Sequence, residues 1–329
     1  MVRAAELPAR IEAALRDGLA APSLELVTIR AGDTFATAQR RDEPFEGVAA
    51  LDLTIRDAPG AVERVLPVVV KAGRGGQEVD AYRRFSGPAP THGLLPAFYG
   101  AHSADEETVL VIERIQNAIL QDTADDIAGW HPPMRWRMID ALAPIHASGL
   151  GQVRDAGRDA PDAVQLLGLI EAGRRRLPRI VTPEVHRLAS GLVDAIDEWY
   201  PPGGALPRTL VHGDFTVRNL CFRADRTPVA YDWAHAGWDM PQRDLVDLLA
   251  STLQPGAEQA ALREPVERHR LALGRAVGVE LDPDAWQQGF RIQLRLGLVD
   301  RVARQWAGTA GPYLARLTAV TTELLRRMS

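Results

Sequence analysis

The chain has 329 residues, a length that predicts two domains or one large bilobal unit. Its composition, 46% hydrophobic and 25% charged, excludes disorder, collagen-like repeats and coiled coil. The net charge of −5 argues against a nucleic-acid partner, because such a surface needs clustered basic residues. The sequence contains no run of about 18 apolar residues, and its first residues do not resemble a secretory signal, so we expect no membrane span. The expected partner is a small molecule.

The single cysteine, Cys221, excludes an intramolecular disulfide and a zinc site made of cysteines. Such sparse cysteine use favours a reducing compartment, and we therefore expect a cytoplasmic protein. Cys221 lies on a short apolar segment, where a free thiol is expected to behave as a small buried hydrophobic group.

Lysine is nearly absent from the sequence. Of the 38 basic residues, only Lys71 is a lysine, and it follows the apolar run 66–70, which predicts a buried strand. One interpretation is that a bias toward arginine left a single lysine by chance. The other is that this position needs a compact ammonium, as in contacts with phosphate oxygens, which a planar guanidinium cannot replace.

The first 113 residues predict a small unit of helices and strands. The expected elements are a helix over 7–19, strands over 24–30, 37–41 and 49–56, a strand ending at Lys71, a glycine-rich turn with Gly73, Gly75 and Gly76, a helix over 78–85 and a strand over 108–113. Residues 114–117 are expected to connect this unit to the rest of the chain.

The remainder predicts a mostly helical unit with a few short strands. The expected elements are a helix from Pro133 to near Gly149, two amphipathic helices within 162–200, strands over 209–211, 220–222 and 229–231, and helices from Ala257 onward with breaks at Gly278, Pro283 and Gly311.

Polar residues cluster between the short strands. Pairing of 220–222 with 229–231 would bring Asn219 and Asp232 together. A carboxylate and an amide oxygen form a hard-oxygen site, which suits Mg²⁺ better than zinc. Asp214 would then be left to act as a base.

The motif His212-Gly213-Asp214, with Asn219 five residues after the aspartate and Asp232-Trp233 further on, resembles the aminoglycoside phosphotransferase and choline kinase superfamily. Members of this superfamily are small-molecule kinases with a protein-kinase-like fold. The resemblance covers about residues 24–250, and residues 32–37 are similar to its ecdysteroid kinase-like branch.

The resemblance implies an α+β, bilobal protein-kinase-like fold. It places a small antiparallel-sheet N-lobe at residues 1–113, a hinge at 114–117 and a larger, mostly helical C-lobe at 118–329. The N-lobe is expected to bind nucleotide, and the C-lobe is expected to carry the catalytic loop and the acceptor site.

The resemblance also implies a role for each matching residue. Asp214 is the expected catalytic base, and Asn219 and Asp232 are the expected Mg²⁺ ligands. The expected nucleotide contacts are Lys71, with Glu78 holding its ammonium, Gly32, Asp33 and Thr34 over the phosphates, and Glu113 and Ile115 near the hinge. His212 and Asp244 are expected to support the loop. The implied nucleotide is ATP, with GTP not excluded.

These features predict transfer of a phosphate from ATP to a hydroxyl of a small molecule. The C-terminal stretch 251–329 holds 11 arginines and 8 acidic residues, a net charge of +3. This charge favours a neutral or anionic hydroxylated acceptor, either a nucleoside- or sugar-containing antibiotic or a metabolite, over a polycationic aminoglycoside. Two alternatives are a nucleotide-binding module without transfer and a metal-dependent hydrolase that also uses His235. The oligomeric state and the phosphorylated hydroxyl cannot be predicted.

Overall fold

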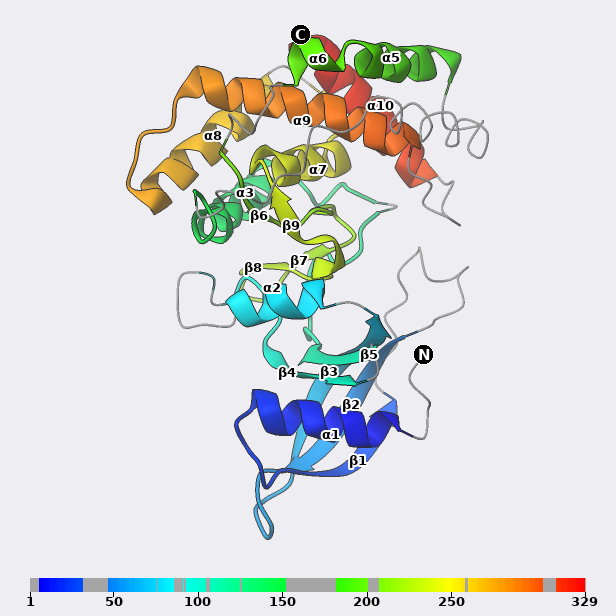
Figure 1. The fold of residues 1–329 in the computed structure, drawn as a ribbon, viewed down its shortest axis with the longest axis vertical. Helices are drawn as coiled ribbons and strands as arrows, with labels where there is room; N and C mark the ends of the chain where they lie inside the picture. Colours follow the sequence, from blue (N-terminus) through cyan, green and yellow to red (C-terminus); the bar gives the residue numbers. More distant parts are fainter. Residues whose placement is uncertain are drawn as a thin grey trace. The chain divides into compact units, whose positions relative to one another are not determined.

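Contacts divide the computed structural model into two units, one around an antiparallel sheet and one mostly helical (Figure 1). The sheet unit contains Met1–Ile119 and Cys221–His235, and the helical unit contains Leu120–Leu220 and Ala236–Ser329. The residues that the structure describes are 6–31, 47–74, 76–85, 91, 93–104, 107–124, 126–151, 182–200, 207–257, 260–303 and 312–328.

The sheet unit is built on five antiparallel strands in the order β1-β2-β3-β5-β4. Its elements up to residue 119 are α1 (Leu7–Gly18), β1 (Glu25–Ala31), β2 (Val48–Arg56), β3 (Arg64–Arg74), α2 (Gln77–Phe85), β4 (Phe98–Ala104) and β5 (Glu107–Glu113). Strand β3 lies at the centre, paired with β2 on one side and β5 on the other.

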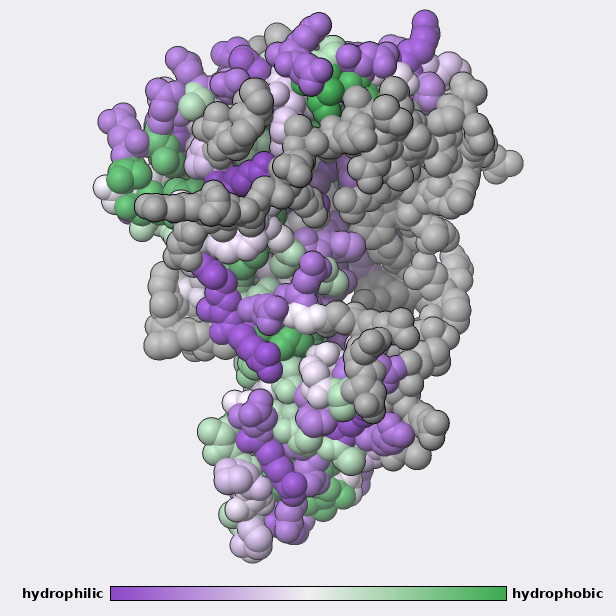
Figure 2. Space-filling model, in the orientation of Figure 1, coloured by the Kyte–Doolittle hydropathy of each residue, from purple (hydrophilic) through white to green (hydrophobic). Residues whose placement is uncertain are grey.

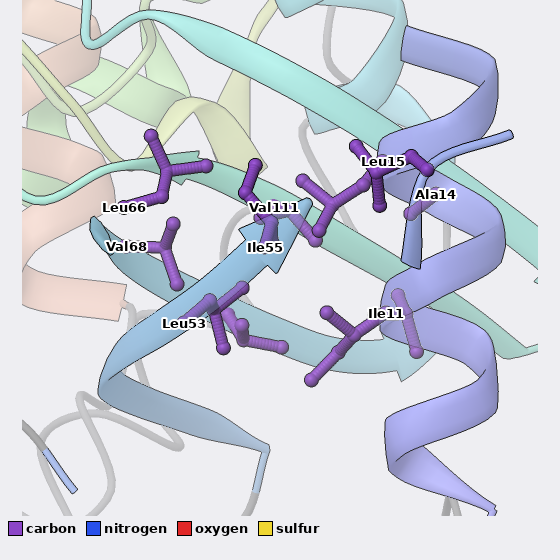
Figure 3. Close-up of a cluster of buried hydrophobic side chains, with 11 residues drawn as sticks. Ile11, Ala14, Leu15, Leu53, Ile55, Leu66, Val68 and Val111 are labelled. Carbon is purple, nitrogen blue, oxygen red and sulfur yellow. The ribbon is translucent and has the colours of Figure 1, made fainter. Parts of the chain in front are cut away.

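Alternation along β3 sends its side chains to opposite faces of the sheet. Val68 and Val70 are buried in a core that the sheet shares with α1, whose Ile11 and Leu15 point into the same cluster (Figure 3). Lys71 directly follows Val70 in the strand, so its side chain lies on the opposite face of the sheet. That face carries Glu78 of α2, with which Lys71 forms an ion pair.

Helix α1 approaches β4 closely enough to require glycine at the contact. A Cβ on Gly100 would clash with the backbone carbonyl of Ala14, and one on Gly18 would clash with the backbone of Tyr99 and Gly100. Gly100 also has a φ of +142°, a backbone conformation that other residues rarely adopt. These glycines therefore allow α1 to pack against the sheet.

The segment 221–235 groups with the sheet unit although it is distant in sequence. Strand β7 (Leu220–Phe222) pairs with β8 (Pro228–Ala230), and Phe222 forms a β-bridge with Ile119. The backbone N–H of Ala230 donates to the carbonyl of Leu94 at 2.9 Å. These backbone hydrogen bonds place 221–235 in the sheet unit, whereas the implied lobe boundaries place it in the C-lobe. The two divisions differ, and the lobe boundaries stay a prediction.

The helical unit consists mainly of α-helices, with one small two-stranded sheet. Its described elements are α3 (Pro132–Ala147), α5 (Pro183–Asp194), α6 (Ile196–Trp199), β6 (Thr209–Val211), β9 (Gly237–Asp239), α7 (Gln242–Thr252), α8 (Ala260–Val277), α9 (Pro283–Ala303) and α10 (Pro312–Met328). Helix α7 is buried along almost its whole length. Hydrophilic residues predominate on the outer helices of this unit in the face that Figure 2 shows.

The predicted α+β class is confirmed, and most predicted elements are present within one or two residues. The exceptions are β4, β9 and α7, which the sequence pattern did not reveal. Gly73 lies inside β3, not in a turn, because its backbone continues the pairing with β5. The predicted strand 37–41 and residues 162–181 lie outside the described residues. In the described part of the chain, no helix combines the length and the apolar character needed to cross a membrane.

Val68→Ala should lower the free energy of unfolding by about 2 kcal/mol, because it removes two buried methyl groups and leaves a cavity in the core. The control is Val65→Ala in the same strand, where the side chain is 64% exposed, and we expect a change within about 0.5 kcal/mol. Urea denaturation followed by circular dichroism measures both. Equal effects of the two substitutions would contradict the proposed core.

Candidate functional site

The ammonium of Lys71 lies between two carboxylates of the sheet unit. Its Nζ donates to Oε1 of Glu78 at 2.7 Å and to Oδ1 of Asp232 at 2.6 Å. Sequence reasoning predicted the contact with Glu78 and missed the one with Asp232, which joins residues 161 positions apart. The strand β3, the helix α2 and the segment after β8 thus meet at one charged group.

Burial and charge act in opposite directions on these groups. Burial lowers the pKa of the Lys71 ammonium, but the carboxylates of Asp232 and Glu78 outweigh it and raise that pKa above its usual value. Burial raises the pKa of the Glu78 carboxyl, and the Lys71 ammonium opposes this only in part. Lys71 is therefore held in its charged form, as a contact with phosphate oxygens requires.

Asp232 is fixed by its place in the chain just after β8. Its φ of +64° is a left-handed conformation that aspartate tolerates better than most residues. The backbone N–H of Trp233 donates to Oε1 of Glu78 at 3.2 Å, and its buried ring packs against Phe85 of α2 with 5.1 Å between centroids. Trp233 therefore anchors the segment that carries Asp232.

The other residues predicted to contact nucleotide have different surroundings. The Glu113 carboxylate forms a two-point ion pair with the Arg223 guanidinium, at 2.5 and 2.7 Å, and accepts from the backbone N–H of Ala97. These partners engage both carboxylate oxygens, and the backbone N–H of Glu113 donates to the carbonyl of Ala97 at 2.8 Å, so a nucleotide contact by Glu113 stays a prediction. Ile115 is buried in a small cluster with Cys221 and Val229. Gly32, Asp33 and Thr34 lie outside the described residues.

In the helical unit, Asn219 holds the side chain of Asp214. Its Nδ2 donates to the carboxylate Oδ2 of Asp214 at 2.8 Å and to the backbone carbonyl of the same residue at 3.0 Å. This orientation uses the amide nitrogen and leaves the carbonyl oxygen of Asn219 as the atom suited to a cation. The aspartate predicted as base is thus fixed by the asparagine predicted as metal ligand.

A buried carboxylate, Asp244 of α7, fixes the start of the same loop. Its two oxygens accept the backbone N–H groups of His212 at 2.8 Å and Gly213 at 3.0 Å. Gly213 has a φ of +81°, which favours glycine at this position. The His212 ring packs edge-to-face with Phe215, at 5.7 Å between centroids, and accepts from the backbone N–H of Asp214. His212 and Asp244 therefore have the contacts expected of loop-supporting residues.

Two buried histidines extend this network. Nε2 of His146 lies 3.0 Å from Oδ2 of Asp244, and Nδ1 of His146 lies 3.1 Å from Nε2 of His269 on α8. Although burial raises the pKa of Asp244, the hydrogen bond to His146 and the nearby histidines outweigh it and lower that pKa. Burial lowers the pKa of His269 well below its usual value. Sequence reasoning missed His269, because nothing local links residues 123 positions apart.

The two residues predicted to bind a cation carry ligand types that Mg²⁺ prefers to those of zinc, the amide oxygen of Asn219 and the carboxylate of Asp232. Asn219 belongs to the helical unit and Asp232 to the sheet unit, so their joint role as ligands stays a prediction. Among the residues that the structure describes, no group of three or more histidine, cysteine, aspartate or glutamate side chains is placed to hold a metal ion. The metal-dependent hydrolase considered from the sequence needed such a group.

Comparison with known proteins identifies the family that the site resembles. Residues 135–278 match the model described as "Phosphotransferase enzyme family". The resemblance to the aminoglycoside phosphotransferase and choline kinase superfamily is confirmed. The segment matched by the phosphotransferase model includes Asp214, Asn219, Asp232 and Asp244, whereas Lys71 precedes it.

Solved structures of phosphotransferases and kinases share the fold at low sequence identity. A candidate aminoglycoside phosphotransferase from Ralstonia eutropha JMP134 is 16% identical, with 97% of this chain and 98% of that one covered and a TM-score of 0.55. LicA in complex with AMP is 12% identical, with 97% and 98% covered and a TM-score of 0.52, and another structure describes LicA as the choline kinase of Streptococcus pneumoniae. A microcompartment-associated aminopropanol kinase is 14% identical, with 94% and 96% covered and a TM-score of 0.50. No curated protein sequence matches the chain. The family match supports a phosphotransferase, and the solved structures show a shared fold.

A partly buried carboxyl of α7 provides a test of these electrostatics by pH. Burial, helped by the nearby carboxylates of Asp214 and Asp244, raises the pKa of Asp247 on α7 to about 7. The guanidiniums of Arg301, at 2.8 Å, and of Arg243 lower this pKa but do not outweigh the burial. A carboxyl with a raised folded-state pKa binds more protons when folded, so the free energy of unfolding falls as pH rises between about 4 and 7.

Asp247→Asn should flatten this fall by an amount on the order of 2–4 kcal/mol across the window, because asparagine does not titrate and can still accept from Arg301. Urea titrations at several pH values measure it. The control is Asp140→Asn, at a more exposed carboxyl paired with Arg268. Parallel stability profiles for Asp247→Asn and the wild type would rule out the raised pKa.

Proposed function

We propose that the protein is a kinase that transfers the γ-phosphate of ATP to a hydroxyl of a small molecule. The observation that carries the proposal is the Lys71 ammonium held at 2.7 Å from Glu78 and 2.6 Å from Asp232. Lysine at this one position, in a chain whose other basic residues are all arginine, fits a need for a compact cation. The phosphotransferase family match supports the same reaction class.

Lys71 binds phosphate oxygens of the nucleotide in this proposal, and Glu78 positions its ammonium. The resemblance implies ATP, and the AMP complex of LicA, which shares the fold, supports nucleotide as the ligand. GTP is not excluded. The backbone of Glu113 and the side chain of Ile115 are proposed to lie near the nucleotide, and Gly32, Asp33 and Thr34 are proposed to cover its phosphates.

Asp214 orients the acceptor hydroxyl and takes its proton. The acceptor oxygen forms a new bond to the γ-phosphorus, the bond from that phosphorus to the β–γ bridging oxygen breaks, and ADP leaves. Asn219 fixes the Asp214 carboxylate and, with Asp232, supplies oxygens for Mg²⁺. When bound, this metal would offset negative charge on the phosphates.

We propose a neutral or anionic hydroxylated acceptor, an antibiotic or a metabolite, from the net charge of +3 in residues 251–329.

The alternative of a nucleotide-binding module without transfer finds no specific support. The residues proposed for the reaction all retain side chains competent for it, namely Lys71, Glu78, Asp214, Asn219 and Asp232. A cytoplasmic location stays a prediction from the sparse cysteine. The experiment that tests the function is mass detection of phosphate transfer from ATP to a panel of hydroxylated compounds.

Asp214→Ala should lower kcat by about 10²–10⁴-fold, because the substitution removes the base that accepts the proton of the attacking hydroxyl. The affinity for MgATP should stay within about twofold of wild type, since the base acts on the acceptor. Steady-state kinetics and nucleotide titration measure the two quantities. The control is Asp284→Ala, at the start of α9. Unchanged turnover in Asp214→Ala would remove this residue from the mechanism.

Lys71→Arg should lower kcat/KM for ATP by at least about tenfold, because the planar guanidinium cannot occupy the same position between Glu78 and Asp232. The matched control is Arg64→Lys in the same strand, which exchanges the two cations at an exposed position paired with Asp57. We expect it to behave as wild type. Full activity of Lys71→Arg would show that the solitary lysine is a coincidence of composition.

A further inference from the structure

Two consecutive side chains of α7 bind the backbone of the loop that carries Asp214. Asp244 accepts the backbone N–H of Gly213 at 3.0 Å. Nη2 of Arg243, the residue before Asp244, donates to the carbonyl of Gly213 at 3.1 Å. This carbonyl belongs to the peptide group that joins Gly213 to Asp214, so α7 bonds to the backbone on both sides of Gly213.

The guanidinium of Arg243 is itself fixed on its other side. Its Nη1 donates to Oδ2 of Asp239 on β9 at 3.0 Å. The second carboxylate oxygen of Asp239 accepts from the backbone N–H of Met240 at 2.8 Å and from Nε2 of Gln293 on α9 at 2.9 Å. Gln293 is buried, so a continuous chain of hydrogen bonds runs from the buried side of α9 to the loop.

Arginine has the chemistry that this position needs. Its planar guanidinium holds the N–H groups in a fixed fork, so one of them can bind a carboxylate while another binds a carbonyl. Burial lowers the pKa of Arg243, but the carboxylates of Asp239 and Asp247 outweigh it and raise that pKa above its usual value. A charged donor forms a stronger hydrogen bond than a neutral one. The bond to the Gly213 carbonyl therefore contributes measurably to the position of the loop.

The next polar groups of the backbone are bound within the loop itself. The N–H of Asp214 donates to Nδ1 of His212 at 3.3 Å. Its carbonyl accepts from the N–H of Thr216 at 2.9 Å and from Nδ2 of Asn219 at 3.0 Å. The carbonyl of Gly213 differs, because its hydrogen bond comes from a helix outside the loop. Gly213 has a φ of +81° and the conformational freedom of glycine, so the direction of this peptide depends on that outside bond.

We propose that Arg243 is a positioning residue for Asp214, which it orients by holding the carbonyl of Gly213. A rotation of the peptide between Gly213 and Asp214 would move the Cα of the aspartate, and with it the carboxylate that is bonded to Asn219. The inference rests on the proposed function, because it concerns the residue proposed as the base. It adds Arg243 to the residues that serve the reaction.

The first experiment is a double-mutant cycle between Arg243 and Asp214. Arg243→Met keeps a long side chain but removes the N–H groups, so it should lower kcat by about 10- to 100-fold. The reaction is transfer from ATP to the compound that the hydroxylated panel identifies. The Kd for MgADP should stay within about twofold of wild type. In the Asp214→Ala background, Arg243→Met should lower kcat by less than about twofold, because the base is already absent.

A residue that acts through Asp214 gives this non-additive result, whereas a residue that only stabilises the fold gives equal losses in both backgrounds. Equal losses, or an unchanged kcat in Arg243→Met, would overturn the positioning role. The matched control is Arg270→Met on α8, because Arg270 also pairs with a carboxylate, that of Glu267, and donates to a backbone carbonyl, that of Leu281. Its kcat should stay within about twofold of wild type. A loss as large as that in Arg243→Met would show a general effect of stability and would also overturn the role.

The second experiment needs no substrate. Hydrogen–deuterium exchange is followed by mass spectrometry over peptides from residues 210–222. Exchange of the loop amides should be at least about tenfold faster in Arg243→Met, because the loop loses a bond to α7. Arg270→Met should exchange there as wild type does. Exchange at the wild-type rate in Arg243→Met would overturn the inference.

Failure of this inference can be told apart from failure of the proposed function. In an enzyme that binds MgATP and transfers phosphate, the overturning results above reject only the role of Arg243. Absence of MgATP binding and of any phosphate transfer in the wild type rejects the kinase, and with it the role of Asp214 that Arg243 is proposed to serve.

Discussion

The pairing of one partly buried ammonium with two carboxylates is the constraint on which the arrangement of the sheet unit depends. A charge removed from water is stable only when opposite charges and hydrogen bonds surround it. Lys71 meets this need with Glu78 from α2 and Asp232 from the segment after β8. The same contacts thus fix the helix against the sheet and hold the distant segment 221–235 to the unit.

A second buried charge organises the loop of the helical unit in the same way. Asp244 accepts two backbone N–H groups at the start of the loop and is itself bonded to His146. Replacing a carboxylate in such a site would leave several buried donors unsatisfied at once, which is costly. The position of Asp214 therefore depends on a network that reaches through α3 and α8, far from the residue in sequence.

In the function that we propose, the two units meet different demands of phosphoryl transfer. Contacts with phosphate oxygens require fixed positive charge, which Lys71 provides in the sheet unit. Proton transfer from a hydroxyl requires a carboxylate held at a set orientation, which Asp214 has through its bond to Asn219.

Local patterns in the sequence predicted most of the elements and the residues that we propose to carry the chemistry. The alternation around Val68 predicted a buried strand, and the spacing from His212 to Asn219 predicted the loop, because both signals lie within a few neighbouring residues. Only the tertiary structure decided that Asp232 contacts Lys71, that His269 reaches His146 and that Arg218 lies over Tyr313. These contacts join residues about 95 to 161 positions apart, and their geometry follows from how whole helices and strands pack, which no local pattern encodes.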